Sequence, residues 1–151
     1  MVRHGEDIGL DADAREALLR DGRECTFIWS TREGWPVGVT MAYLWERERF
    51  WLVTGAERPR VAAVRRDPRV SIVVSGAART LTAKGRCSLR EDDVSRGWVY
   101  ASFAARQARL FPDLIDAQLL GSRLARMQRM ILEVTPEQWI SYDARGAGDV
   151  V

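Results

Sequence analysis

The feature that most constrains the fold is the alternation of apolar and polar residues along two stretches of the chain. From Val37 to Trp45 every second residue is a large apolar one, and from Arg79 to Leu89 small or apolar residues alternate with polar ones. Successive side chains of a β-strand point to opposite faces of a sheet, so both stretches are predicted to be half-buried strands. We expect about six strands in all and therefore a mainly β (α+β) fold.

Residue type and turn-forming residues predict the remaining elements. Strands are expected over residues 24–31, 50–54, 70–75 and 130–134, with Pro136 interrupting before a shorter segment at 138–142. Segment 50–54 is expected to pair with 37–45 as a hairpin. Helices are expected over 11–20, 58–66 and 94–109, and a further helix after Pro112 uses Leu114, Ile115, Leu119 and Leu124. A small barrel or sandwich decorated by helices accommodates this order of elements.

Composition favours a single soluble domain. The chain has 151 residues, of which 46% are hydrophobic and 29% charged, and this length suits one domain with a sizeable core. We expect residues 1–143 to form that domain and the glycine-containing residues 144–151 to form a flexible tail. No run approaches the about 20 apolar residues of a membrane-spanning helix, and no signal peptide is recognisable. A cytoplasmic location without membrane contact is therefore expected.

Charge, cysteine and histidine content argue against several functional classes. The 23 basic residues nearly balance the 21 acidic ones, whereas nucleic-acid-binding domains usually carry a strong basic excess. Cys25 and Cys87 are too few for a metal cluster and fall within predicted strands, where they are expected to be small core residues. His4 is the only histidine, which argues against a catalytic triad and against a histidine-ligated metal.

The start of the helix predicted over 58–66 is the first candidate site. Pro59 occupies its first turn, which leaves the N–H groups of Arg60 and Val61 unpaired at the positive end of the helix. Such ends attract anions, above all phosphate. Arg58 and Arg60 flank this end and offer forked, permanently charged donors. These residues predict a phosphate site without a glycine-rich loop.

Two neighbours bear on this prediction in opposite directions. Thr54, at the end of the preceding strand, adds a hydroxyl on the approach to the helix. Glu57 places a carboxylate near the same end and would repel an anion unless it points away. A solvent-exposed helix with two spare arginines explains the pattern equally well, and both interpretations remain open.

The polar face of the strand at 79–89 is the second candidate, formed by Thr80, Thr82, Lys84 and Arg86. A polar face usually means that one side of a sheet meets water. The functional interpretation is that Thr80 and Lys84 line a cofactor groove. Near the end of the chain, Trp139 and Tyr142 are candidates for packing on a flat ligand.

Several segments, taken in order, resemble the split-barrel flavoproteins related to pyridoxamine 5'-phosphate oxidase. The resemblance is carried by residues 50–54 (FWLVT), 58–61 (RPRV), 66–71 (RDPRVS), 84–86 (KGR) and 134–139 (VTPEQW). It covers residues 24–90 well and the end of the chain more loosely. The run RDPRVS after a short arginine-containing helix is its most specific part.

The resemblance implies a six-stranded split β-barrel with peripheral helices and a homodimer that binds FMN in a groove between subunits. By the same resemblance, three groups of residues would contact the cofactor: Val39, Thr40 and Met41 beside the ring, Thr54, Arg58 and Arg60 at the phosphate, and Thr80 near the ring's polar edge. Arg60 stands where the family typically has a lysine. Tyr142 or Trp139 would approach from the partner subunit.

Two departures argue against a vitamin-B6 oxidase. Gly38 stands where the true oxidases have a phosphate-binding arginine, and their substrate-binding C-terminal Arg and His have no counterpart in residues 141–151. The expected function is therefore an FMN-dependent oxidoreductase that transfers hydride to or from a small conjugated substrate, with the cofactor supplying the chemistry.

Three alternatives remain open. The same fold is expected to serve a reductase that uses the deazaflavin coenzyme F-420, whose acidic tail would be bound by Arg58, Arg60, Arg65 and Lys84. A non-catalytic flavin or haem storage protein is the second alternative. The third is an interaction protein that binds a partner through the helical segment 94–124.

Overall fold

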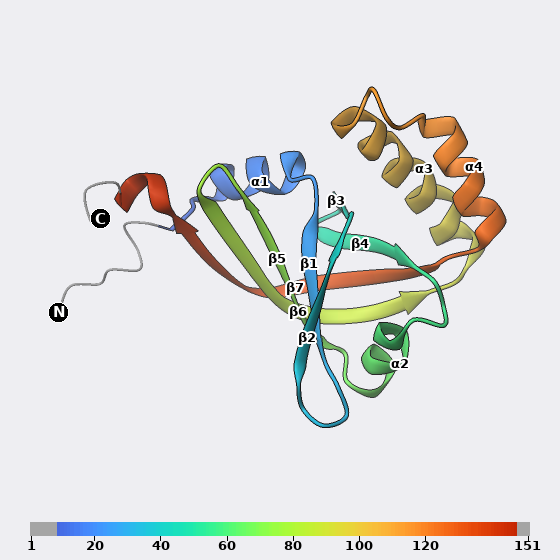
Figure 1. Ribbon diagram of the computed structural model, residues 1–151, viewed down its shortest axis with the longest axis horizontal. Helices are drawn as coiled ribbons and strands as arrows, with labels where there is room; N and C mark the ends of the chain where they lie inside the picture. Colours follow the sequence, from blue (N-terminus) through green and yellow to red (C-terminus); the bar gives the residue numbers. More distant parts are fainter. Residues whose placement is uncertain (1–8, 148–151) are drawn as a thin grey trace.

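Seven antiparallel strands form one curled sheet in the computed structural model, which describes residues 9–147 (Figure 1). The strands lie in the order β2-β1-β5-β6-β7-β4-β3. Their bounds are β1 Cys25–Ser30, β2 Pro36–Met41, β3 Leu44–Glu46, β4 Arg49–Thr54, β5 Arg69–Gly76, β6 Arg79–Arg90 and β7 Met130–Asp143. The helices are α1 Ala12–Asp21, α2 Pro59–Arg66, α3 Asp93–Leu110 and α4 Ala117–Met127, followed by a 3-10 turn at Ala144–Ala147.

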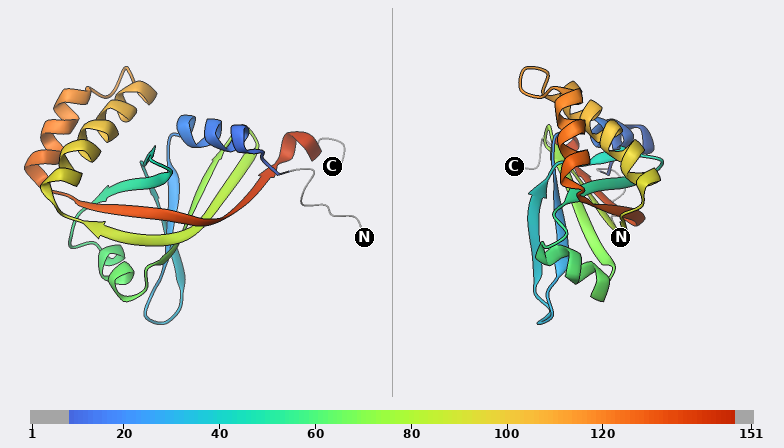
Figure 2. Two further views of the ribbon diagram at one scale, coloured as in Figure 1. Left: turned by 180° about the vertical axis from the view of Figure 1, so that it is seen from behind. Right: turned by 90° about the vertical axis from the view of Figure 1, so that its right-hand side faces the viewer.

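The curl of the sheet separates a concave inner face from an outer face (Figure 2). Alternate residues of β1, β5 and β6 point inward and form the main core, as the burial of Phe27, Ile72 and Leu81 shows. Helix α1 lies along the concave side, and α2 packs against β1 and β6. Helices α3 and α4 form a hairpin that encloses a second apolar cluster with β3 and β4, which contains Leu44, Trp51 and Phe103. The predicted mainly β (α+β) fold with peripheral helices is confirmed, and the sheet is a curled half-barrel whose edges are β2 and β3.

The expected number of six strands is wrong, and the stretch 37–45 explains the difference. It divides into β2, which pairs with β1, and β3, which pairs with β4 at the opposite edge of the sheet. The break falls at Ala42 and Tyr43. Tyr43 is fully buried, and its hydroxyl donates to the Leu19 carbonyl over 2.7 Å. Because the chain stays extended while it crosses between edges, its alternation continues through the break. The predicted hairpin with 50–54 is therefore restricted to β3 and β4.

The interruption predicted at Pro136 is also wrong, because β7 runs as one 14-residue strand. A register shift between Lys84 and Gly85 places Gly85 opposite Pro136. On its other side β7 pairs with β4 only through Met130–Val134, so the proline lies where no such ladder bond is needed. A Cβ on Gly85 would collide with the Thr135 carbonyl, which explains the glycine.

The helices follow the predicted boundaries closely. Asp11 caps α1 by accepting from the Ala14 N–H at 2.8 Å, and Pro59 occupies the first turn of α2. The helix predicted after Pro112 begins later than expected, since Leu114 and Ile115 precede the Asp116 cap of α4. Within residues 9–147, no helix is long and apolar enough to span a membrane. His4 and residues 148–151 of the predicted tail lie outside the described residues.

Candidate functional site

The start of α2 keeps part of the predicted anion site. The N–H of Val61, predicted to be unpaired, instead donates to the Arg58 carbonyl at 3.0 Å, so it is not available to a ligand. Val61 itself is buried at 1% exposure, as is Thr54 at 6%. Arg58 caps the helix through its backbone only. Of the predicted donors, the Arg58 and Arg60 side chains remain, together with the Arg60 N–H, which has no backbone acceptor before α2 among the described residues.

Glu57 forms an ion pair with one of these two arginines, Arg58. Its carboxylate lies over Gly55 and its Oε1 is 4.0 Å from Nε of Arg58, with both side chains exposed. Arg58 also lines a hollow of about 410 Å³ together with Arg129, which follows α4. The repulsion predicted from Glu57 is therefore partly countered within the chain.

Arg60 is the cation without such a partner. Its guanidinium carbon lies 5.7 Å from the centre of the Trp29 ring on β1. Its Nε is buried and has no hydrogen-bond partner among the described residues. Burial, and secondarily the positive charge of Arg58, lower the pKa of Arg60. A bound anion would supply the missing acceptor, so this residue fits the phosphate end of a flavin cofactor.

A groove of about 630 Å³ lies on the outer face of the sheet beside Trp29, and we call it the outer groove. Lys84 lies in it at the register position between Ser71 and Gln138. The other polar walls of this groove are Ser30, Asp67, Arg69, Arg86 and Glu137.

Pairing within the outer groove singles out one basic residue. Arg69 binds Asp67 at 2.7 Å and thereby lowers the pKa of that carboxyl to about 2, and Arg86 binds Glu137 at 2.7 Å. Lys84 has no carboxylate within ion-pair distance in the described part of the chain. It is therefore the cation in this groove that can meet an anion.

A second hollow, of about 410 Å³, opens where β1 begins, because the β5–β6 hairpin continues beyond the first residues of β1. We call it the split pocket. Thr26, Thr40, Val73 and Ser75 line it from the sheet, and the end of α1 lines it from above. Because successive outward residues of β1 and β5 line the split pocket and then the outer groove, the two hollows adjoin on one face.

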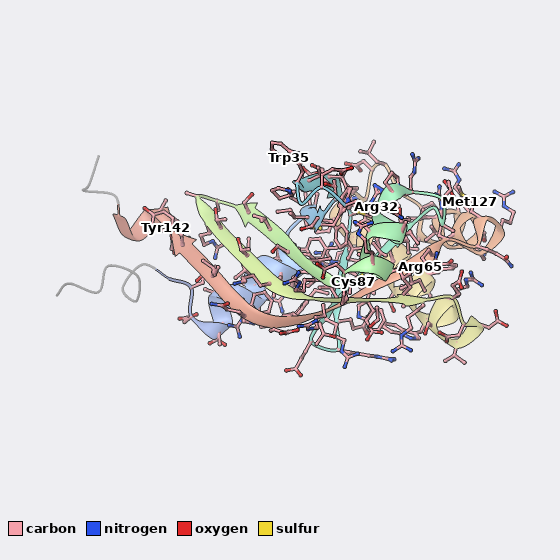
Figure 3. The ribbon with its side chains drawn as sticks, turned by 90° about the horizontal axis from the view of Figure 1, so that it is seen from below. Arg32, Trp35, Arg65, Cys87, Met127 and Tyr142 are labelled. Atoms are coloured by element: carbon pink, nitrogen blue, oxygen red, sulfur yellow. The ribbon has the colours of Figure 1, made fainter. Side chains whose placement is uncertain are left out.

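The other predicted cofactor contacts lie apart from α2. Thr40 faces the split pocket, whereas Val39 is paired with buried Phe27 and Met41 packs against the core. Thr80 and Tyr142 are paired and exposed where β6 begins and β7 ends; Figure 3 labels Tyr142. A single chain therefore distributes the predicted residues over two sides of the sheet.

Trp139 and Tyr142 have different environments, although the sequence offers both as ligand contacts. Trp139 is opposite Ala83 on the inner face and lies 4.9 Å below the Arg15 guanidinium, packed against the core. Tyr142 is 42% exposed. Sequence reasoning missed Trp29, because only the folded chain brings it to Arg60.

The sequence profile of the pyridoxamine 5'-phosphate oxidase family matches residues 13–143. No curated protein matches the chain. Among solved structures, the conserved hypothetical protein Rv2991 from Mycobacterium tuberculosis is similar over 97% of this chain and 93% of its own, with a TM-score of 0.83 and 20% identity.

Two further structures have the same fold and belong to proteins of different kinds. An F-420 reductase aligns with a TM-score of 0.63 and 19% identity over 82% of this chain and 94% of its own. The haem storage protein HutZ from Vibrio cholerae aligns with a TM-score of 0.63 and 15% identity over 87% and 94%. At these identities the structures establish the fold alone, while the profile match covers most of the chain. The chain belongs to the pyridoxamine 5'-phosphate oxidase-like family of split-barrel proteins.

Proposed function

We propose that this protein is an oxidoreductase that binds FMN, with Arg60 holding the phosphate. The observation that carries the proposal is the half-buried Arg60 guanidinium, whose Nε lacks an acceptor in the described chain. A permanently charged donor that is partly desolvated and unsatisfied is unfavourable unless a ligand completes it. A phosphate dianion meets this need better than a neutral ligand does.

The residues of this chain would bind and orient the cofactor, which would itself supply hydride transfer. Thr40 faces the split pocket, and Thr80 is paired with Ser75, which lines the same pocket. Strand β2 is an edge strand, so the peptide groups on its free side are available to the polar edge of a ring. Lys84 offers a second positive charge on the outer face.

A second copy of the chain would complete the site. The outer face carries exposed apolar residues, notably Ile140 at 52% and Tyr142 at 42% exposure. In a homodimer with the cofactor groove between subunits, this face would become buried, and the residues that one subunit holds apart would meet across the interface.

The direct test is the absorption spectrum of the purified protein, followed by titration with FMN. We expect a flavin spectrum or saturable binding, and reduction of the bound flavin by a nicotinamide donor. Sedimentation should report a dimer. Absence of binding at physiological FMN concentrations contradicts the proposal.

Coenzyme F-420 is the second candidate, because its long acidic tail needs more cations than a single phosphate does. In the outer groove the tail would meet Lys84 first, and it would compete with Asp67 and Glu137 for Arg69 and Arg86, which those two carboxylates already bind. A competition titration of FMN against F-420 on one preparation distinguishes them, since the tighter ligand displaces the other. Tight FMN binding without reduction by any donor would instead favour storage.

A further inference from the structure

The split pocket has an apolar floor and, at the end formed by the β5–β6 turn, a basic residue in its lining; Arg23 is the other basic residue that lines it. Leu18 and Val73 supply apolar surface, and Thr26, Thr40 and Ser75 supply hydroxyls. Its volume of about 410 Å³ falls within the range of small-molecule sites. Such a lining suits a ligand with a flat apolar body and one polar end.

Arg79 is the basic group at that end. It begins β6 directly after a two-residue turn, and it is paired with Gly76 of β5 in the antiparallel ladder. Both turn residues, Ala77 and Ala78, have left-handed backbone angles, with φ of 51° and 62°, so the hairpin tip is held in one defined turn. The Nε of Arg79 is buried without a hydrogen-bond partner in residues 9–145.

Two of the three carboxylates in or beside the pocket, those of Asp143 and Asp21, have ion-pair partners other than Arg79, although the charge of Arg79 contributes, after Arg145, to lowering the pKa of Asp143. Asp143, opposite Arg79 in the ladder, accepts from Nε and Nη2 of Arg145 at 3.0 and 2.8 Å. Asp21, which lines the pocket, lies 3.6 Å from Arg109. Glu24 is the pocket carboxylate without an ion pair among the described residues.

Arg23, the other basic residue that lines the pocket, has its guanidinium over the Phe111 ring instead. Its guanidinium carbon lies 5.3 Å from the centre of the Phe111 ring, beyond the end of α3. Arg79 is therefore the pocket guanidinium that is left to meet an incoming anion.

We propose that the split pocket is the substrate site and that Arg79 binds the carboxylate of a small conjugated carboxylic acid. This rests on the proposed function, because the pocket includes Thr40 and adjoins Thr80, which are expected beside the flavin ring. The conjugated body lies on the apolar floor, next to the ring, and the carboxylate is bidentate on Arg79.

The experiment measures calorimetric binding of trans-cinnamate and of its neutral analogue cinnamamide to the full chain, with and without FMN. Cinnamate should bind at least tenfold more tightly than cinnamamide. Arg79→Ala should weaken cinnamate binding at least tenfold and leave cinnamamide unchanged, and Arg79→Lys should restore part of the loss. Glu24→Gln should strengthen cinnamate binding severalfold. Arg65→Ala, on the exposed side of α2, is the matched charge-loss control (Figure 3).

The outcomes separate the two proposals. If FMN binds but cinnamate and cinnamamide bind equally, or Arg79→Ala has no more effect than Arg65→Ala, the substrate site is wrong and the cofactor proposal stands. If FMN does not bind while cinnamate binding depends on Arg79, the pocket is an anion site and the proposed function is wrong. Circular dichroism of each variant shows whether the fold is retained.

Discussion

Arg106 and Arg60 are both partly desolvated arginines, and their surroundings differ in one decisive respect. Arg106 on α3 is 7% exposed and donates to the carbonyls of Tyr43 at 2.8 Å, Leu19 at 2.9 Å and Gly22 at 2.7 Å. These last two carbonyls belong to the end of α1, where the helix dipole favours a cation. Arg60 stands in the first turn of α2, where the dipole disfavours one, and its Nε has no described acceptor.

Desolvation alone does not mark a binding residue. Burial lowers the pKa of both arginines, so the shift does not distinguish them. The hydrogen-bond acceptors distinguish them. Backbone carbonyls accept from Arg106 and so link α3 to α1 and to the β2–β3 break, whereas the Nε of Arg60 has no acceptor among the described residues. The first is structural, and the second is available for a ligand.

The largest effect is expected for Arg106→Met. Removing the guanidinium leaves buried carbonyls without donors, and hydrogen bonds to charged groups contribute about 1.5–3 kcal/mol each. We expect the free energy of unfolding to fall by about 3–5 kcal/mol, measured by urea denaturation. Arg65→Met is the surface control. A loss below about 1 kcal/mol would show that Arg106 does not hold these segments together.

Arg60→Ala should weaken cofactor binding and leave folding stability almost unchanged, the reverse of the effect expected for Arg106→Met. FMN binding should weaken by about 1.5–3 kcal/mol, because a charged hydrogen bond is lost. The free energy of unfolding without cofactor should stay within about 0.5 kcal/mol, since no described acceptor is left unsatisfied. Fluorescence titration and urea denaturation of one preparation measure the two quantities. Loss of stability with unchanged FMN affinity would show that Arg60 is a structural residue and does not bind the cofactor.

Alkaline pH should weaken the region around Arg106. Burial raises the pKa of Cys25 and of Tyr43 to about 12, from 9.0 and 10.0. The unfolded chain therefore releases these protons first, so stability is full below pH 9 and falls as pH rises toward 12. The Cys25 thiol should account for a loss on the order of 1 kcal/mol by pH 10. Urea midpoints across pH 7–11 test this, and Cys25→Ala should flatten the decline. A midpoint independent of pH contradicts it.

The smallest effect is expected for Asp67→Asn in the outer groove. Asp67 is paired with Arg69 at an exposed position, so the substitution should change folding stability little. It frees one positive charge beside Lys84, and the affinity for an anionic cofactor should rise about twofold to threefold at low salt. Titrations at two salt concentrations measure this gain. Weaker binding would show that the ion pair holds the groove in its binding geometry, and that its effect on the positive charge of Arg69 is secondary.

The anion site was only partly predictable. The pattern of Pro59 and its flanking arginines located the start of α2, because caps and prolines act through their nearest neighbours. It did not reveal that the Val61 N–H is used by Arg58, or that Trp29 lies under Arg60. Those contacts depend on how α2 packs against β1.

Most of the fold was determined by the sequence alone. Alternation identified β6 and the inward residues Leu81 and Ala83, and Asp11 and Pro59 located the starts of α1 and α2, because these signals act over one strand or one helical turn. Only the tertiary structure decided that residues 37–45 cross between the two edges of the sheet and that β7 continues through Pro136 opposite Gly85. An extended chain keeps its two-residue period whether or not it pairs, so the choice of partner is made by the curl of the sheet, which sets where its two edges lie.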